Sequence, residues 1–388
     1  MWLSRITDSL PSAAAKASNG LKLGSMTRLV DPSIASAVAR RIAGTSGLDR
    51  SYLLDRLKSD LDVAVPRAEE LVAEASGIPA PPPVAWGLID RATWAEANIS
   101  SMTAMLNPIA EKIGDRLDRL PTVARLAQRA VVSVEVGVLL GYVSRRVLGQ
   151  YDLLVPEDDG SPEARRRRRR LPAGGAALYF VGPNLIETER RFGFVPRDFA
   201  MWVALHEVTH RFQFEGVPWL RPHFLDLVKR YVDTVDIDTK GLIARLRVAA
   251  QRLASKDFPP EERSPMYLLA TDEQRVVLDE IQALMAVVEG HGNFVMDSVG
   301  ERVIPSMRRM RFIFERRRDQ VNGIQKILSS TLGLEMKMKQ YELGQAFCEA
   351  AVREAGSDVL ARLWVGPGQF PTLAELKEPE LWLGRVAA

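Results

Sequence analysis

The segment from Asp198 to Glu215, which reads DFAMWVALHEVTHRFQFE, restricts the possible folds of this chain more than any other stretch. Its apolar residues recur at helical spacing, and Pro196 just before it suits the first position of a helix. We therefore expect a helix from about Pro196 to about Glu215. His206 and His210 lie four residues apart, so both imidazole rings fall on one face of this helix, about 5–6 Å apart at their Cβ atoms. The fold must therefore bury most of this apolar helix and leave room for two histidine rings on one of its faces.

The letters HEVTH within this segment match the pattern H-E-x-x-H, which is typical of zinc-dependent hydrolases. Two imidazoles at this spacing can bind one Zn²⁺ ion, and Glu207 lies where a general base would reach a water molecule beside the metal. The pattern fixes only three positions, so a chance match is the alternative. However, the chain has only four histidines among 388 residues, and two of them fall here. The apolar neighbours that would give the metal a dry wall are Phe199, Trp202, Val203 and Leu205.

A catalytic zinc site needs a third protein ligand and keeps its fourth position for water. The best candidate is Glu289, in the stretch LMAVVEGHGNFVMDSVG at residues 284–300. The helix that carries it is expected to begin with a capping box, in which Thr271 is the N-cap and Gln274 its reciprocal partner. Glu289 follows on a largely apolar surface, where a carboxylate is costly unless it is paired or bound to a metal. In the alternative interpretation, Glu289 only ends the helix.

His291, two residues after Glu289, is the competing third ligand. If it is not a ligand, it is a candidate catalytic residue that donates a hydrogen bond to the developing oxyanion. The glycines on either side of it would let the backbone approach the metal closely. The alternative is that His291 caps the end of the helix in solvent. Asn293 and Asp297 are candidates for orienting a ligating histidine through its second ring nitrogen.

The charge of the chain gives little reason to expect a nucleic-acid or membrane partner. There are 52 Lys and Arg residues against 49 Asp and Glu residues, a net charge of +3. The consecutive arginines from Arg165 to Arg170 lack interleaved aromatic residues, which favours a solvated loop. The apolar stretch AVVSVEVGVLLGYV is too short to span a bilayer. The lone Cys348 cannot form an internal disulfide, so we expect a buried thiol in a cytoplasmic protein.

Most of the chain shows helical periodicity, so we expect a mainly α fold (α+β with a minor strand component). The most strand-like run is AALYFVGPNLIE, which is either a core strand or an edge strand that pairs with an extended substrate. Four prolines between Pro79 and Pro83 form a stiff connector and mark the best domain boundary. The expected parts are a loosely ordered segment at 1–30, an N-terminal helical subdomain at 31–78, a main domain at 86–388 and, within it, a flexible Arg-rich loop at 157–172.

Four blocks between about residues 130 and 300 carry a family resemblance: VEVGVLLGYVSRRVLGQYD, VGPNLIE, FAMWVALHEVTHRFQFEGVPWLRPHF and ALMAVVEGHGNFVMD. Together they resemble the zincin-like metallopeptidases and hydrolases of actinobacteria and related bacteria, one branch of which is associated with biosynthesis of a deazaflavin cofactor. The resemblance implies a mostly helical zincin-like fold with an HExxH active-site helix. It implies His206, His210 and Glu289 around a metal, with Glu207 as catalytic base. Related families often have Asp four residues after the third ligand, where this chain has Asn293.

Two functions agree with these residues. The first is a zinc-dependent hydrolase, most specifically a metallopeptidase for a peptide or protein substrate, in which Zn²⁺ and Glu207 activate water. The second is a zinc-bound scaffold without catalytic activity, linked to cofactor biosynthesis. Tyr231 and Tyr267 are further candidates for the oxyanion donor, and His223 is either a spare ligand or a surface histidine. The sequence does not predict an oligomeric state.

Overall fold

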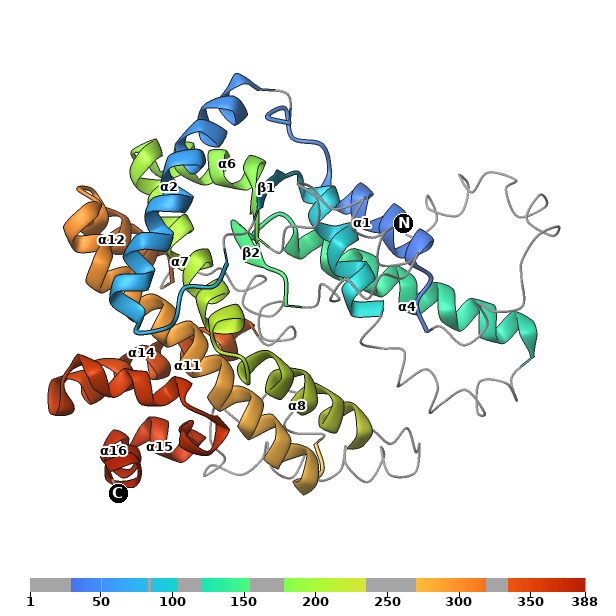
Figure 1. Cartoon of the computed structure of the whole chain (residues 1–388). Coiled ribbons are helices and arrows are strands. Elements are labelled where there is room, and N and C mark those ends of the chain that lie inside the picture. The colour runs from blue at the N-terminus through green and yellow to red at the C-terminus, as the bar shows by residue number, and fades with distance from the viewer. Residues whose placement is uncertain are drawn as a thin grey trace.

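The described residues form a mainly helical structure with one small sheet, which confirms the predicted fold class (Figure 1). The predicted N-terminal segment 1–30, apart from its last two residues, and the predicted loop 157–172 lie outside the described residues. The computed structural model describes residues 29–49, 51–82, 85–103, 121–153, 178–234, 270–318 and 334–387.

The sheet has its most buried strand in the middle. The strand order is β1-β3-β2, with β1 parallel and β2 antiparallel to β3. Side chains alternate across a strand, so Leu178 and Phe180 enter one apolar core while Tyr179 and Val181 enter a second. The run LYFV is therefore a core strand and not an edge. The strands are β1 (Trp86–Ile89), β2 (Gly149–Tyr151) and β3 (Leu178–Val181).

The smaller core lies between α1, the helical residues 91–103 and α4. Two glycines of α4 allow close packing on α1: a Cβ atom on Gly137 would lie 2.6 Å from the carbonyl oxygen of Ala35. By length and composition alone, α4 is long and apolar enough to cross a membrane, because the helix begins at Thr122, before the apolar stretch that was expected to be too short. Val134 and Val138 of this helix are exposed. The bounds are α1 (Pro32–Ala43) and α4 (Thr122–Val143).

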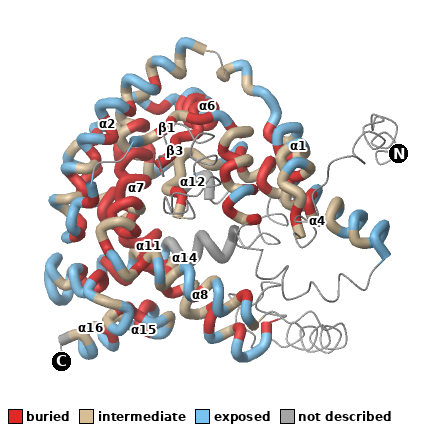
Figure 2. The backbone as a smooth tube through the Cα atoms, turned by 45° about the vertical axis from the view of Figure 1, so that its right-hand side comes forward, coloured by how far each residue is buried: buried red, intermediate tan, exposed pale blue. Residues whose placement is uncertain are grey.

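The larger core surrounds α7, which lies between α2 and α11 (Figure 1). Figure 2 shows that α7 is buried along most of its length. Because α2 contributes Leu57, Leu61 and Val65 to this core, the segment at 31–78 shares it with later helices. The helices are α2 (Tyr52–Ser76), α6 (Gly182–Phe192), α7 (Pro196–Gly216), α8 (Leu220–Thr234), α11 (Asp272–Val303), α12 (Met307–Arg318) and α14 (Leu334–Ala355).

A buried arginine attaches α7 to α2 and to the proline-rich connector. The side chain of Arg211 is 1% exposed and forms ion pairs with Glu69 of α2 and with Glu215 of its own helix. Its guanidinium also donates to the carbonyl oxygen of Pro82. Tyr151 of β2 donates to Glu215 at 3.1 Å, so the same group of side chains reaches the sheet. A buried charge that lost these partners would destabilise the fold strongly.

Two glycines allow α11 and α14 to cross in close contact. A Cβ atom on Gly344 would overlap the carbonyl oxygen of Ala286, and one on Gly290 would overlap the backbone of Gly344. α11 begins at the predicted capping box of Thr271 and Gln274 and continues without interruption to Val303. On α14, Cys348 is fully buried, as predicted, and burial raises the pKa of its thiol.

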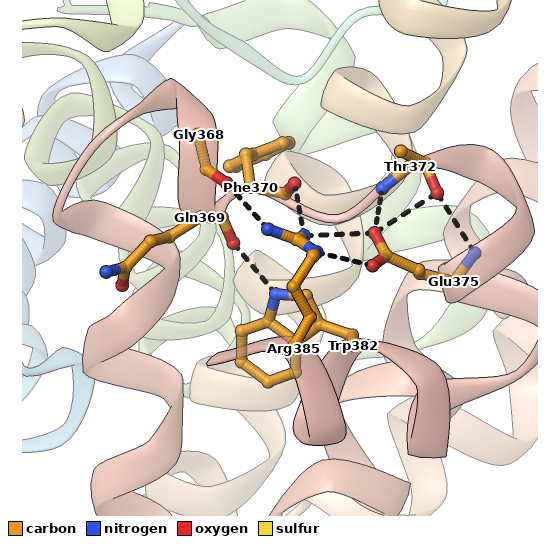
Figure 3. Close-up of polar contacts among 7 residues, drawn as sticks. All are labelled: Gly368, Gln369, Phe370, Thr372, Glu375, Trp382 and Arg385. Atoms are coloured by element: carbon orange, nitrogen blue, oxygen red, sulfur yellow. Dashed lines mark hydrogen bonds and ion pairs between the residues drawn. The ribbon is translucent and has the colours of Figure 1, made fainter. Parts of the chain in front are cut away.

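One arginine and one tryptophan hold the C-terminal segment together (Figure 3). Arg385 forms an ion pair with Glu375 and donates to the carbonyl oxygens of Gly368 and Phe370. Trp382 is fully buried and donates to the carbonyl oxygen of Gln369 at 2.8 Å. The elements are η7 (Ser357–Trp364), η8 (Pro367–Gln369), α15 (Leu373–Lys377) and α16 (Pro379–Ala387). We call residues 368–385 the C-terminal lock.

Replacing Gly344 with alanine should lower the free energy of unfolding by about 1–3 kcal/mol, since the new methyl group would force α14 away from α11. Urea denaturation followed by circular dichroism measures this. Gly384→Ala on α16 is the matched control, because an added Cβ atom there meets nothing within 4 Å. Equal stability changes in the two variants would contradict the close helix crossing.

Candidate metal centre

α7 carries two histidines on one face and directs the glutamate between them to another side. The helix starts at Pro196, has Asp198 in its first turn, and keeps regular geometry through residues 206–210. The side chains of His206 and His210 are 22% and 13% exposed and lie on one face. Glu207 is one residue further round the helix and is buried. The sequence prediction for this helix is therefore confirmed.

Three ligand atoms meet where α7 crosses α11. The Nε2 atoms of His206 and His210 are 3.1 Å apart. A carboxylate oxygen of Glu289 lies 3.2 Å from Nε2 of His210 and 3.8 Å from Nε2 of His206. Among the described residues these are the His, Cys, Asp and Glu side chains grouped closely enough to hold a metal ion. The structure thus brings together the three predicted ligands.

The spacing of these atoms fits Zn²⁺. Tetrahedral bonds of about 2.0–2.1 Å place neighbouring ligand atoms about 3.3 Å apart, close to the separations seen here. The donor set of two imidazoles and one carboxylate also suits zinc, and it leaves one coordination position for a water molecule or a substrate. Converging lone pairs in a buried setting would repel one another unless a cation or a proton lay between them.

The pKa of His210 is raised by the groups around it. Burial by itself lowers this pKa, but the carboxylate of Glu289, together with the charge of Glu207 and the hydrogen bond to Gln213, raises it from 6.5 to about 9. In the metal-free protein, a proton on His210 therefore takes the place of a cation beside Glu289. A metal ion that binds here must expel this proton.

The side chain of Glu207 extends from α7 toward the sheet. Gly149, the first residue of β2, is so close that a Cβ atom there would lie 2.6 Å from Cγ and 2.8 Å from Oε1 of Glu207. The missing side chain of Gly149 therefore leaves the space that the carboxylate occupies. No feature of the sequence pointed to Gly149, because this contact joins residues far apart in the chain.

His291 lies behind the three ligands and not among them. Its side chain is fully buried, and its Nδ1 atom is 3.1 Å from the side-chain nitrogen of Gln213. Its ring contacts Trp364 edge to face, with centroids 4.8 Å apart. Burial, followed by the charge of His210, lowers the pKa of His291 to about 3. Sequence reasoning missed Gln213, although its position three residues after His210 places it on the same side of α7.

The two glycines beside His291 lie within α11 and do not end it. Gly290 faces α14, while Gly292 lies beside the rings of His206 and His210.

The remaining residues that the sequence suggested for the site make other contacts. Asp297 pairs with Arg311 and Gln345 instead of a ligating histidine. Within the described part of the chain, Asn293 makes no hydrogen bond to a histidine. His223 and Tyr231 belong to α8, where His223 contacts Trp219, and Tyr267 lies outside the described residues.

The affinity for Zn²⁺ should rise as the pH rises from 6.5 to about 9, because zinc competes with the proton that Glu289 holds on His210. Calorimetry in two buffers of different ionisation enthalpy should detect about one proton released per zinc ion in this range. A Glu289→Gln variant should bind zinc more weakly and release less proton near pH 8. Binding at pH 7.5 without proton release would contradict this account of His210.

Comparisons with known proteins agree with this geometry. The family model described as zincin-like metallopeptidase matches residues 30–383. A crystal structure of a candidate hydrolase with a novel fold from Chloroflexus aurantiacus superimposes with a TM-score of 0.63 at 29% sequence identity, covering 92% of this chain and 99% of that one. The comparison with curated proteins gave no match. The chain belongs to the zincin-like metallopeptidase family.

Proposed function

We propose that this protein is a zinc-dependent hydrolase, most specifically a metallopeptidase that cleaves a peptide or protein substrate. One observation carries the proposal: the ligand atoms of His206, His210 and Glu289 converge beside the buried Glu207, which lies on α7 between the two histidines. Family membership and the similar structure of a candidate hydrolase support the same reaction class. We also propose a cytoplasmic location, and the link to deazaflavin biosynthesis stays a prediction from the resemblance.

His206 and His210 would hold the metal through Nε2, and Glu289 through one carboxylate oxygen. Zinc bound there supplies a Lewis acid that acidifies a water molecule and polarises the substrate carbonyl group. Glu207 then acts as the base: a carboxylate oxygen takes one proton from the attacking water. The same carboxyl group delivers that proton to the leaving amine. The water oxygen ends on the carbonyl carbon, and the carbon–nitrogen bond breaks.

The accessible side of α7 indicates what else would contact a substrate. Between Phe199 and Phe214, the helix is partly exposed only at Met201, Trp202, His206 and His210. Trp202 stacks on Phe314 of α12, with ring centroids 4.8 Å apart and planes within 10° of parallel. Because this aromatic pair continues the stripe that carries the ligands, we propose that it receives an apolar side chain of the substrate.

A Glu207→Gln variant should bind zinc as tightly as the wild type but lose at least about a hundredfold in kcat, because the amide cannot accept the proton. Zinc content by mass spectrometry of metals and cleavage of a peptide library test both parts. Glu301→Gln, at an exposed position of α11, is the control and should keep full activity. Cleavage by Glu207→Gln at the wild-type rate would exclude this mechanism. If neither protein cleaves any peptide while zinc stays bound, the scaffold alternative is favoured.

A Gly149→Ala variant tests the position of the base without changing its chemistry. The added methyl group would overlap the Glu207 side chain, so we expect kcat to fall by at least about tenfold with an unchanged zinc content. A crystal structure of the variant should show the carboxylate displaced. Activity equal to the wild type, with Glu207 in place, would mean that the space beside Gly149 has no role in the reaction.

A further inference from the structure

One glutamine side chain connects a predicted metal ligand to the buried His291. The side-chain oxygen of Gln213 lies 2.9 Å from Nδ1 of His210. Its side-chain nitrogen lies 3.1 Å from Nδ1 of His291 and donates to the carbonyl oxygen of Val288 at 2.9 Å. Gln213 is fully buried, so its amide group depends on these three partners.

The carbonyl oxygen of Val288 decides which way the amide of Gln213 faces. A carbonyl oxygen only accepts hydrogen bonds, so it must face the NH₂ group of the amide. The amide oxygen then faces His210, and it can only accept a hydrogen bond from Nδ1. The NH₂ group also faces His291, and its second N–H donates to Nδ1 of that ring. One backbone carbonyl therefore determines the proton positions on two histidines.

We infer that Gln213 is a positioning residue that keeps a proton on Nδ1 of His210 and a lone pair on Nδ1 of His291. The proton on Nδ1 leaves Nε2 of His210 to face Glu289 and the metal. Glu207 and the three metal ligands keep the roles described above. His291 acts through Gln213 and does not touch the substrate. This inference rests on the proposed metal site but not on the proposed hydrolysis.

The surroundings of Nε2 of His291 are compatible with this proton position. With a lone pair on Nδ1, the neutral ring carries its proton on Nε2, and this buried atom has no hydrogen-bond partner among the described residues. The ring meets Trp364 at 74°, an arrangement compatible with an N–H group directed at an aromatic ring. Trp364 in turn contacts Phe370, whose carbonyl oxygen accepts from Arg385 in the C-terminal lock (Figure 3).

The first experiment reads the ring nitrogens of the wild-type protein directly. With four histidines in the chain, ¹⁵N NMR of ring-labelled protein gives four ring systems to assign, and His206→Gln, His223→Gln and His291→Asn variants assign three of them and leave His210 as the fourth. We expect a proton on Nδ1 of His210 and a lone pair on Nδ1 of His291, both with and without one equivalent of Zn²⁺. A proton on Nδ1 of His291, or a lone pair on Nδ1 of His210, overturns the inference even if zinc binds and peptides are cleaved.

Two substitutions separate positioning from packing. Gln213→Glu keeps an acceptor for His210 but offers His291 no N–H group. We therefore expect His291 to move its proton to Nδ1, with the protonation pattern of His210 unchanged and zinc affinity within about fivefold of wild type. Gln213→Leu removes both contacts and should weaken zinc binding by about 10–100-fold.

Gln345→Leu is the matched control, because the amide of Gln345 contacts Asp297 and Glu349 and no histidine. It should leave all ring nitrogens and the zinc affinity unchanged. If Gln213→Glu leaves His291 as in the wild type, Gln213 does not set its proton position and the inference is wrong. If Gln213→Leu does not fold, the wild-type spectra and Gln213→Glu still decide.

Discussion

Where α7 crosses α11, two imidazole nitrogens and a carboxylate oxygen lie within 3.8 Å of one another in a largely apolar interior. Such a group is stable only with a positive charge between its members, either a metal ion or the proton that the raised pKa of His210 indicates. The surrounding structure holds the two helices at this crossing. α2 and the buried Arg211 fix one side of α7, and the glycine contact with α14 fixes the back of α11.

Different groups lie on the two sides of the three candidate ligands. On one side, the edge of the sheet at Gly149 leaves room for the carboxylate of Glu207. On the other side, Gln213 and His291 fill the interior between the ligands and Trp364. Glu207, the proposed base, thus lies toward the sheet, while the groups proposed to orient His210 face away from it. The carboxylate of Glu207 and the hydrogen-bonded pair of Gln213 and His291 therefore lie on opposite sides of the candidate metal centre.

Local patterns in the sequence predicted the parts of the site that lie on single helices. Pro196 marked the start of α7, the spacing of His206 and His210 placed both rings on one face, and the capping box marked the start of the helix that carries Glu289. These features depend on neighbours within a few residues, which a sequence displays directly. Glu289 was predicted as the third ligand because a carboxylate on an apolar helix face is costly unless it has a partner, and the structure places its carboxylate beside both histidines.

The features that sequence analysis missed depend on contacts between distant segments. The alternative interpretation ended the helix at Glu289, but α11 continues through Gly290 and Gly292 to Val303, and Gly290 packs against Gly344 of α14. The importance of Gly149 and Gln213 became visible only when β2 met Glu207 and when Val288 met the amide. In the same way, the strand LYFV could not be assigned to the centre of the sheet before its partners were known.

Diffraction data collected at the zinc absorption edge from crystals of the zinc-loaded protein test the central claim most directly. The account predicts one anomalous peak per chain, bonded to Nε2 of His206, Nε2 of His210 and one carboxylate oxygen of Glu289 at about 2.0–2.2 Å, with a water molecule in the fourth position. A peak at another place, no peak at this crossing, or a fourth protein ligand that closes the site would contradict it.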